Sequence, residues 1–115
     1  MKIRKTSKNG NSVLRLSGDL NFASYKALRQ VVEDLFEQKQ KKIIVDLGDV
    51  THIDSMGLGT ITQLWKEGYE RGQEICLAAP NPNVANMIRL VNLDKRIKVY
   101  ESVGDSSEKV GDASE

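Results

Sequence analysis

Residues 43–59 read IIVDLGDVTHIDSMGLG, and the architecture of the chain can be worked outward from them. The apolar beginning predicts a strand over residues 42–47 that is buried on both faces. A short polar loop follows, in which Asp54 is a good N-cap for a helix that begins at Ser55. This pattern places one hydroxyl group at the carboxyl end of a strand, where open α/β sheets carry their functional groups.

The residues before this stretch predict a hairpin and a helix. Residues 2–8 alternate weakly and carry many charges, which suits an edge strand. The dipeptide Asn9-Gly10 favours a tight turn into a second strand, because both positions accept a positive φ. Asn21 is a good helix cap, and apolar residues then recur at helical spacing to about Glu37.

The residues after it predict two helices separated by a strand, and then a last strand. The helix that begins at Ser55 runs to about residue 71, and Gly72 suits its C-terminal cap. Asn81, followed by proline, starts another helix between strands expected at residues 74–79 and 97–100. The apolar side chains expected to line this helix are Val84, Met87, Ile88 and Val91.

Strands and helices that alternate along a chain imply parallel strands joined by right-handed crossovers. The predicted class is α/β, with one domain at residues 1–102. It should hold a mostly parallel sheet of about five strands, an N-terminal hairpin and three or four helices. Residues 103–115 are rich in Gly, Ser, Asp and Glu and nearly lack apolar residues, which is typical of a disordered tail.

Composition excludes several classes of function. The 115 residues include 17 basic and 16 acidic ones, so there is no global basic footprint for nucleic acid. No apolar run reaches the roughly 18 residues of a membrane helix, and no signal core follows the basic N-terminus, so a cytoplasmic protein is expected. Cys76 lies in an apolar segment that suits an inert core thiol. With one histidine and one cysteine, neither a metal site nor another cofactor is expected.

Three roles can be weighed for Ser55. A serine at a helix start commonly makes local hydrogen bonds. A catalytic serine needs a base, and His52 lies only three residues upstream, too cramped for a triad. The hydrolase pattern G-x-S-x-G is absent here, and the glycines at 57 and 59 fit neither a Walker loop nor a dinucleotide fingerprint. Hydrolysis is therefore not expected, and Ser55 is either a residue that makes local hydrogen bonds, which composition alone favours, or a candidate phosphorylation site.

Gly57 and Gly59 stand in the first turns of this predicted helix, where each costs about 0.5–1 kcal/mol relative to alanine. Glycine can allow the helix to pack closely on the sheet. It can also leave bare surface beside Ser55 for a partner. The sequence leaves both explanations open.

The segment Asp54-Ser55-Met56-Gly57-Leu58-Gly59, with the strand before it, resembles the D-S-x-G-L-G signature of the STAS family. The family name joins sulfate transporters with anti-sigma factor antagonists. The resemblance continues at residues 17–21, Ser-Gly-Asp-Leu-Asn, and at residues 92–94, Asn-Leu-Asp. It covers roughly residues 3–101 and supports a STAS-type domain.

The resemblance implies a stand-alone anti-sigma factor antagonist, which is a regulatory binding protein and not an enzyme, with Ser55 as its phosphorylation site. Such a protein, when unphosphorylated, binds an anti-sigma factor that is also a serine kinase, and sigma factor is released. The kinase then phosphorylates Ser55, the phosphorylated protein dissociates, and a serine phosphatase restores it. The implied partner-binding residues are Asn21, where the family more often has aspartate, and Asp54, Ser55, Met56, Gly57 and Gly59.

The alternative is a STAS scaffold subunit of a stress-signalling assembly or an accessory of a membrane transporter. In either case the expected partners are proteins, and neither nucleic acid nor membrane is an expected partner.

Overall fold

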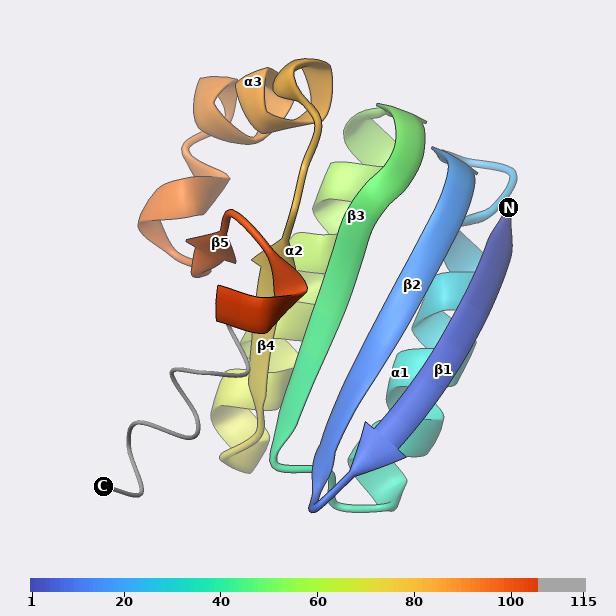
Figure 1. The fold of residues 1–115 in the computed structure, drawn as a ribbon, viewed down its shortest axis with the longest axis vertical. Coiled ribbons are helices and arrows are strands. Elements are labelled where there is room, and N and C mark those ends of the chain that lie inside the picture. Colours follow the sequence, from blue (N-terminus) through green and yellow to red (C-terminus); the bar gives the residue numbers. More distant parts are fainter. Residues whose placement is uncertain (106–115) are drawn as a thin grey trace.

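Figure 1 shows a sheet whose five strands follow one another in chain order, β1-β2-β3-β4-β5. This computed structural model describes residues 1–105. The β1–β2 pair is antiparallel and the other pairs are parallel, so the predicted α/β class with its N-terminal hairpin is confirmed. The elements are β1 (Lys2–Lys8), β2 (Asn11–Leu20), α1 (Tyr25–Glu37), β3 (Lys42–Ile53), α2 (Ser55–Arg71), β4 (Glu74–Ala78), α3 (Pro82–Leu90), the 3₁₀ helix η1 (Leu93–Lys95) and β5 (Val99–Tyr100).

The hairpin turn follows from the local chemistry of Asn9 and Gly10. Their φ angles are 56° and 81°, so both residues occupy the left-handed region that asparagine and glycine accept most easily. Two such residues give a turn whose twist matches that of the flanking strands. Lys8 and Asn11 are consequently paired directly across the turn, and the predicted hairpin is confirmed.

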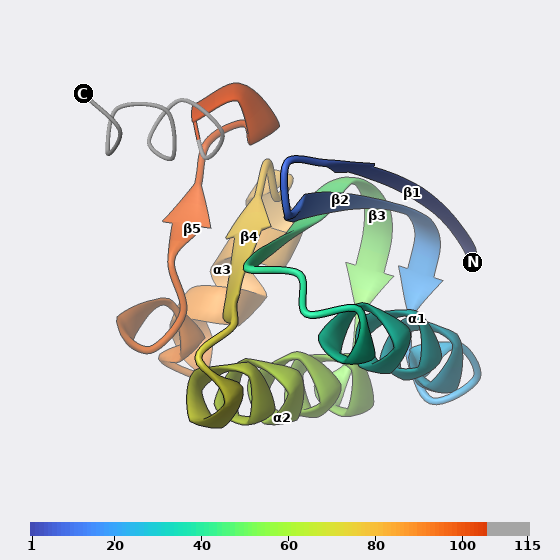
Figure 2. The same cartoon turned by 90° about the horizontal axis from the view of Figure 1, so that it is seen from below.

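Helices α1 and α2 lie side by side against one face of the sheet (Figure 2). Alternate side chains of the central strands point towards them, because successive residues of a strand face opposite ways. The core between these layers includes Leu14, Leu16, Leu28, Val32, Leu35, Phe36, Ile43, Val45, Leu47, Leu58, Ile61, Leu64, Ile75 and Leu77.

The opposite face of the sheet carries a smaller apolar cluster of Ile44, Cys76 and Ala78, with Val13 and Tyr100 packed against it. Burial raises the pKa of the Cys76 thiol to about 12. A thiol so rarely ionised is a poor nucleophile, which agrees with the inert core cysteine expected from the sequence.

Strand β3 is longer than the sequence predicted. The polar loop expected after Leu47 is in fact the second half of the strand, which pairs with β2 as far as Ile53 opposite Leu20. Val50 and Ile53 are buried in the core, and β2 supplies the backbone partners for this segment. The loop prediction was wrong because this pairing is made with a distant part of the chain. His52 therefore lies on a strand.

Helix α1 begins later than predicted, because Asn21 does not cap it. Asn21 Oδ1 instead accepts a hydrogen bond from Ala23 N at 2.9 Å, which closes a turn within residues 21–24. The helix begins at Tyr25, and Ser24 stands at its N-cap without a side-chain capping bond. The polar side chain of Asn21 thus stabilises a separate loop between β2 and α1.

Helix α3 begins as expected, with Asn81 Oδ1 accepting a hydrogen bond from Val84 N at 2.8 Å. Its predicted inward face is only half correct. Val84 and Ile88 are buried, whereas Met87 and Val91 are exposed. A helix of nine residues turns one narrow stripe towards the sheet, and Val91 lies beyond its last residue.

After α3 the described chain holds only short elements. Strand β5 spans two residues, fewer than the expected residues 97–100. Residues 103–105 are helical, and Val103 packs against the small cluster around Ile44. The remainder of the predicted tail, residues 106–115, lies outside the described residues, so the boundary at residue 102 stays a prediction. Across residues 1–105, no helix combines the length and apolar character needed to cross a membrane.

Candidate functional site

Ser55 is the first residue of α2 and is exposed to solvent. Asp54 is extended, with φ −107° and ψ −177°, and its Oδ1 accepts a hydrogen bond from Gly57 N at 2.8 Å. The predicted N-cap is therefore confirmed. Within residues 1–105 the Ser55 hydroxyl has no hydrogen-bond partner, so it is free to meet a reagent from solvent.

The other oxygen of Asp54 reaches a different part of the chain. Asp54 Oδ2 accepts a hydrogen bond from Phe22 N at 3.1 Å, and Asp54 N donates to Leu20 O at 3.2 Å. The β2–α1 loop, residues 21–24, is thereby fastened to the start of α2. Asn21 lies in that loop, so the structure brings together Asn21, Asp54 and Ser55 from segments far apart in sequence.

The surface beside Ser55 is apolar as well as polar. Phe22 has 73% of its surface exposed, and Met56, the residue after Ser55, has 44%. Phe22 was not singled out from the sequence. The sequence did offer a signal for it: Phe22 is a large aromatic residue in a turn, and it does not belong to the apolar stripe of α1 that includes Leu28 and Val32. Its closeness to Ser55 depends on a bond across 32 positions, which no local pattern reports.

The two glycines of the signature differ in their surroundings. A Cβ on Gly57 would lie 2.5 Å from Leu20 O and 2.9 Å from Leu20 Cγ, closer than real Cβ atoms approach their neighbours. A Cβ on Gly59 would meet nothing within 4 Å. Close packing therefore accounts for Gly57, and bare surface describes Gly59, which lies one helical turn beyond Ser55.

His52 faces Asp19 rather than forming a catalytic pair with Ser55. Its Nδ1 lies 3.3 Å from Asp19 Oδ1, at the carboxyl end of β2, and both side chains are largely exposed. No hydrogen bond joins His52 to Ser55 within residues 1–105, so the base required by a serine nucleophile is not in contact with it. Nor does any group of three His, Cys, Asp or Glu side chains in this range have the arrangement of a metal site.

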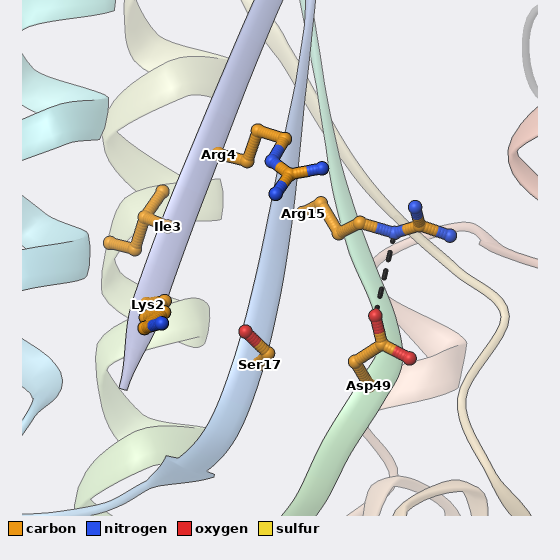
Figure 3. Close-up of a pocket in the computed structure, with 6 residues that line it drawn as sticks. All are labelled: Lys2, Ile3, Arg4, Arg15, Ser17 and Asp49. Atoms are coloured by element: carbon orange, nitrogen blue, oxygen red, sulfur yellow. Dashed lines mark ion pairs between the residues drawn. The ribbon is translucent and has the colours of Figure 1, made fainter.

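A hollow lies on the sheet face opposite to the one that α1 and α2 cover. Figure 3 shows Arg4 and Arg15 side by side on adjacent strands, with Asp49 on the next strand. The cavity measures about 410 Å³. Arg15 Nε lies 3.4 Å from Asp46 Oδ2 and 3.6 Å from Asp49 Oδ2. These two carboxylates offset the positive charge of Arg15, so the hollow is poorly suited to bind a free anion. The surface around Ser55 is the better candidate for a functional site.

Comparison with known proteins identifies the family. The STAS domain model matches residues 2–106, and the chain belongs to the STAS family. Over 99 residues it is 32% identical to a Thermotoga maritima protein named "Putative anti-sigma factor antagonist", a match covering 85% of this chain and 88% of that protein. A Thermotoga maritima crystal structure described in the same words superimposes with a TM-score of 0.88 at 28% identity, covering 94% of this chain and 93% of that one.

SpoIIAA has the same fold in two states. Its unphosphorylated structure has a TM-score of 0.81 at 18% identity, covering 95% of this chain and 96% of SpoIIAA. The structure of the Bacillus protein in its phosphorylated form has a TM-score of 0.76 at 17% identity, covering 95% and 99%. At these identities the likeness concerns the fold alone.

Proposed function

We propose that this protein is an anti-sigma factor antagonist controlled by phosphorylation of Ser55. In its unphosphorylated form it binds an anti-sigma factor that is also a serine kinase, so that sigma factor is released. Phosphorylation by that kinase ends the interaction, and a serine phosphatase restores it. The protein acts in the cytoplasm by binding proteins and is not itself an enzyme.

One observation carries the proposal: an exposed serine, whose hydroxyl has no hydrogen-bond partner among residues 1–105, stands at the first position of a 17-residue helix. Relatives named as anti-sigma factor antagonists support the partner class. SpoIIAA, solved in a phosphorylated form, supports the idea that this fold tolerates a phosphate.

The chemistry of a helix N-terminus favours a phosphate there. A phosphoserine carries about −1.5 to −2 charges at neutral pH. The first N–H groups of a helix have no intrahelical acceptor and stand at the positive end of its dipole. The folded protein should therefore accept the modification, and release must come from repulsion, steric block or desolvation at the interface. A loss of about 3 kcal/mol in binding corresponds to roughly a hundredfold weaker affinity.

The test incubates the protein with each purified ATP-binding anti-sigma factor of the source organism and labelled ATP, followed by phosphopeptide mapping. We expect label on Ser55, no label on Ser55→Ala, and unchanged labelling of the control Ser102→Ala, an exposed serine near β5. The labelled protein should bind the kinase about a hundredfold more weakly. Undiminished labelling of Ser55→Ala, or no labelling of the wild type by any such kinase, would refute the proposal.

A further inference from the structure

Phe22 combines high exposure with a fixed backbone. Its side chain is 73% exposed, yet all four backbone N–H groups of its loop, residues 21–24, donate hydrogen bonds. Phe22 N donates a hydrogen bond to Asp54 Oδ2 at 3.1 Å. On the other side of the loop, Ser24 Oγ donates one to Asp19 O at 2.7 Å. An aromatic side chain on a preorganised loop loses little conformational entropy when a partner covers it, which favours tight binding.

A second exposed apolar side chain stands next to Ser55 in the chain. Met56 follows Ser55 directly and is 44% exposed. Gly59 lies four residues beyond Ser55, hence on the same side of α2, and adds no side chain that would keep a partner away. A kinase that brings ATP to the Ser55 hydroxyl must also cover the residues next to it. Aromatic and methionine side chains are the types enriched at the centres of such interfaces.

We propose that Phe22 and Met56 form the apolar anchor that the anti-sigma factor kinase covers when it engages Ser55. This inference rests on the function proposed above. We also assign Asp54 as the positioning residue of this anchor. Both of its oxygens already accept backbone hydrogen bonds, one from Gly57 N and one from Phe22 N. Asp54 thus affects the affinity for the partner through Phe22, because it holds the β2–α1 loop beside Ser55.

The first experiment measures the affinity of alanine variants for the kinase that labels Ser55. Phe22→Ala should weaken binding at least about 30-fold, and Met56→Ala by roughly 3- to 10-fold, as expected when interface anchors are truncated. Tyr69→Ala is the matched control. Tyr69 is an equally exposed aromatic residue at 76%, on α2 but about 21 Å along the helix from Ser55. Its replacement should change affinity less than about twofold.

A second experiment tests the positioning role with Asp54→Asn. Asparagine caps helices as well as aspartate does, so Gly57 N keeps its acceptor and thermal stability should change little. The carboxamide nitrogen is a donor, so Phe22 N loses its acceptor. Amide hydrogen exchange at Phe22 should become faster. The substitution should weaken binding about fivefold in the wild-type background and less than twofold in the Phe22→Ala background.

These results separate the inference from the proposed function. If Ser55 is labelled but Phe22→Ala and Met56→Ala bind like Tyr69→Ala, the apolar anchor is refuted and the antagonist function stands. If Asp54→Asn weakens binding equally in both backgrounds, Asp54 contacts the partner directly and its positioning role is refuted. If no kinase labels the wild type, the proposed function fails and the inference fails with it.

Discussion

Alanine at Gly57 and alanine at Gly59 should change the stability of this protein in opposite directions, although the two positions are neighbours on α2. At Gly57 the new Cβ would lie 2.5 Å from Leu20 O, 2.9 Å from Leu20 Cγ and 3.0 Å from Ile53 Cγ1. The nearest of these atoms belongs to the backbone of β2, which cannot move aside as a flexible side chain can. The helix start must shift instead, and the capping bond from Gly57 N to Asp54 weakens with it.

The expected magnitudes follow from these contacts. Overpacking of this kind destabilises a protein by about 1–3 kcal/mol. The higher helix propensity of alanine stabilises the helix by up to about 1 kcal/mol. Because the closest clash, at 2.5 Å, is with a backbone atom, the cost lies in the upper part of that range. The free energy of unfolding of Gly57→Ala should therefore fall by roughly 1–2 kcal/mol. Gly59→Ala meets no atom within 4 Å. It should gain about 0.5–1 kcal/mol, because only the propensity term applies.

Urea and thermal melts of the full chain measure both changes. A change of 1 kcal/mol shifts the midpoint by about 4–8 °C in a domain of this size, so opposite shifts are easily resolved. A Gly57→Ala variant as stable as the wild type, or a destabilised Gly59→Ala variant, would refute the packing argument. Under the proposed function, Gly59→Ala should also weaken kinase binding about tenfold, and normal affinity would reject an interface role for Gly59.

Two further substitutions and one labelling experiment test other parts of the structure. Ser55→Asp should leave the melting temperature within a few degrees of wild type, because the helix dipole favours a negative charge there, and calorimetry should show about hundredfold weaker kinase binding; unchanged affinity would count against an interface at Ser55. Asn81→Ala removes the hydrogen bond that caps Val84 N and the 2.8 Å hydrogen bond to Val50 O, so urea melts should show a free energy of unfolding lower by about 1–2 kcal/mol. An unchanged stability would contradict the role of these two bonds. Cys76 should react with a thiol reagent at pH 8 roughly a thousandfold more slowly in the folded protein than in denaturant, because burial raises its pKa from 9.0 to about 12. The same shift implies that the stability linked to this thiol is intact below pH 9 and declines between pH 9 and 12; fast labelling of the native protein would show that the thiol is accessible.

Much of the fold is encoded by short-range chemistry. Asn9-Gly10 specifies the hairpin turn, because both residues accept a positive φ. Asp54 caps α2 and Gly72, with φ 73°, ends it, since each of these needs only its immediate neighbours in the chain. The alternation of strands and helices then specifies a mostly parallel sheet. For the same reason, the exposed position of Ser55 at a helix start could be predicted from the sequence.

Contacts between distant segments decided the rest. The second half of β3 is polar enough to predict a loop, and it is a strand because β2 supplies its backbone partners. Phe22 joins the site through one hydrogen bond to Asp54, 32 positions away. Gly57 and Gly59 are the same residue in the same local pattern, yet the carbonyl of Leu20 crowds only Gly57. Packing energy depends on which atoms meet across the fold, and local propensity does not contain that information.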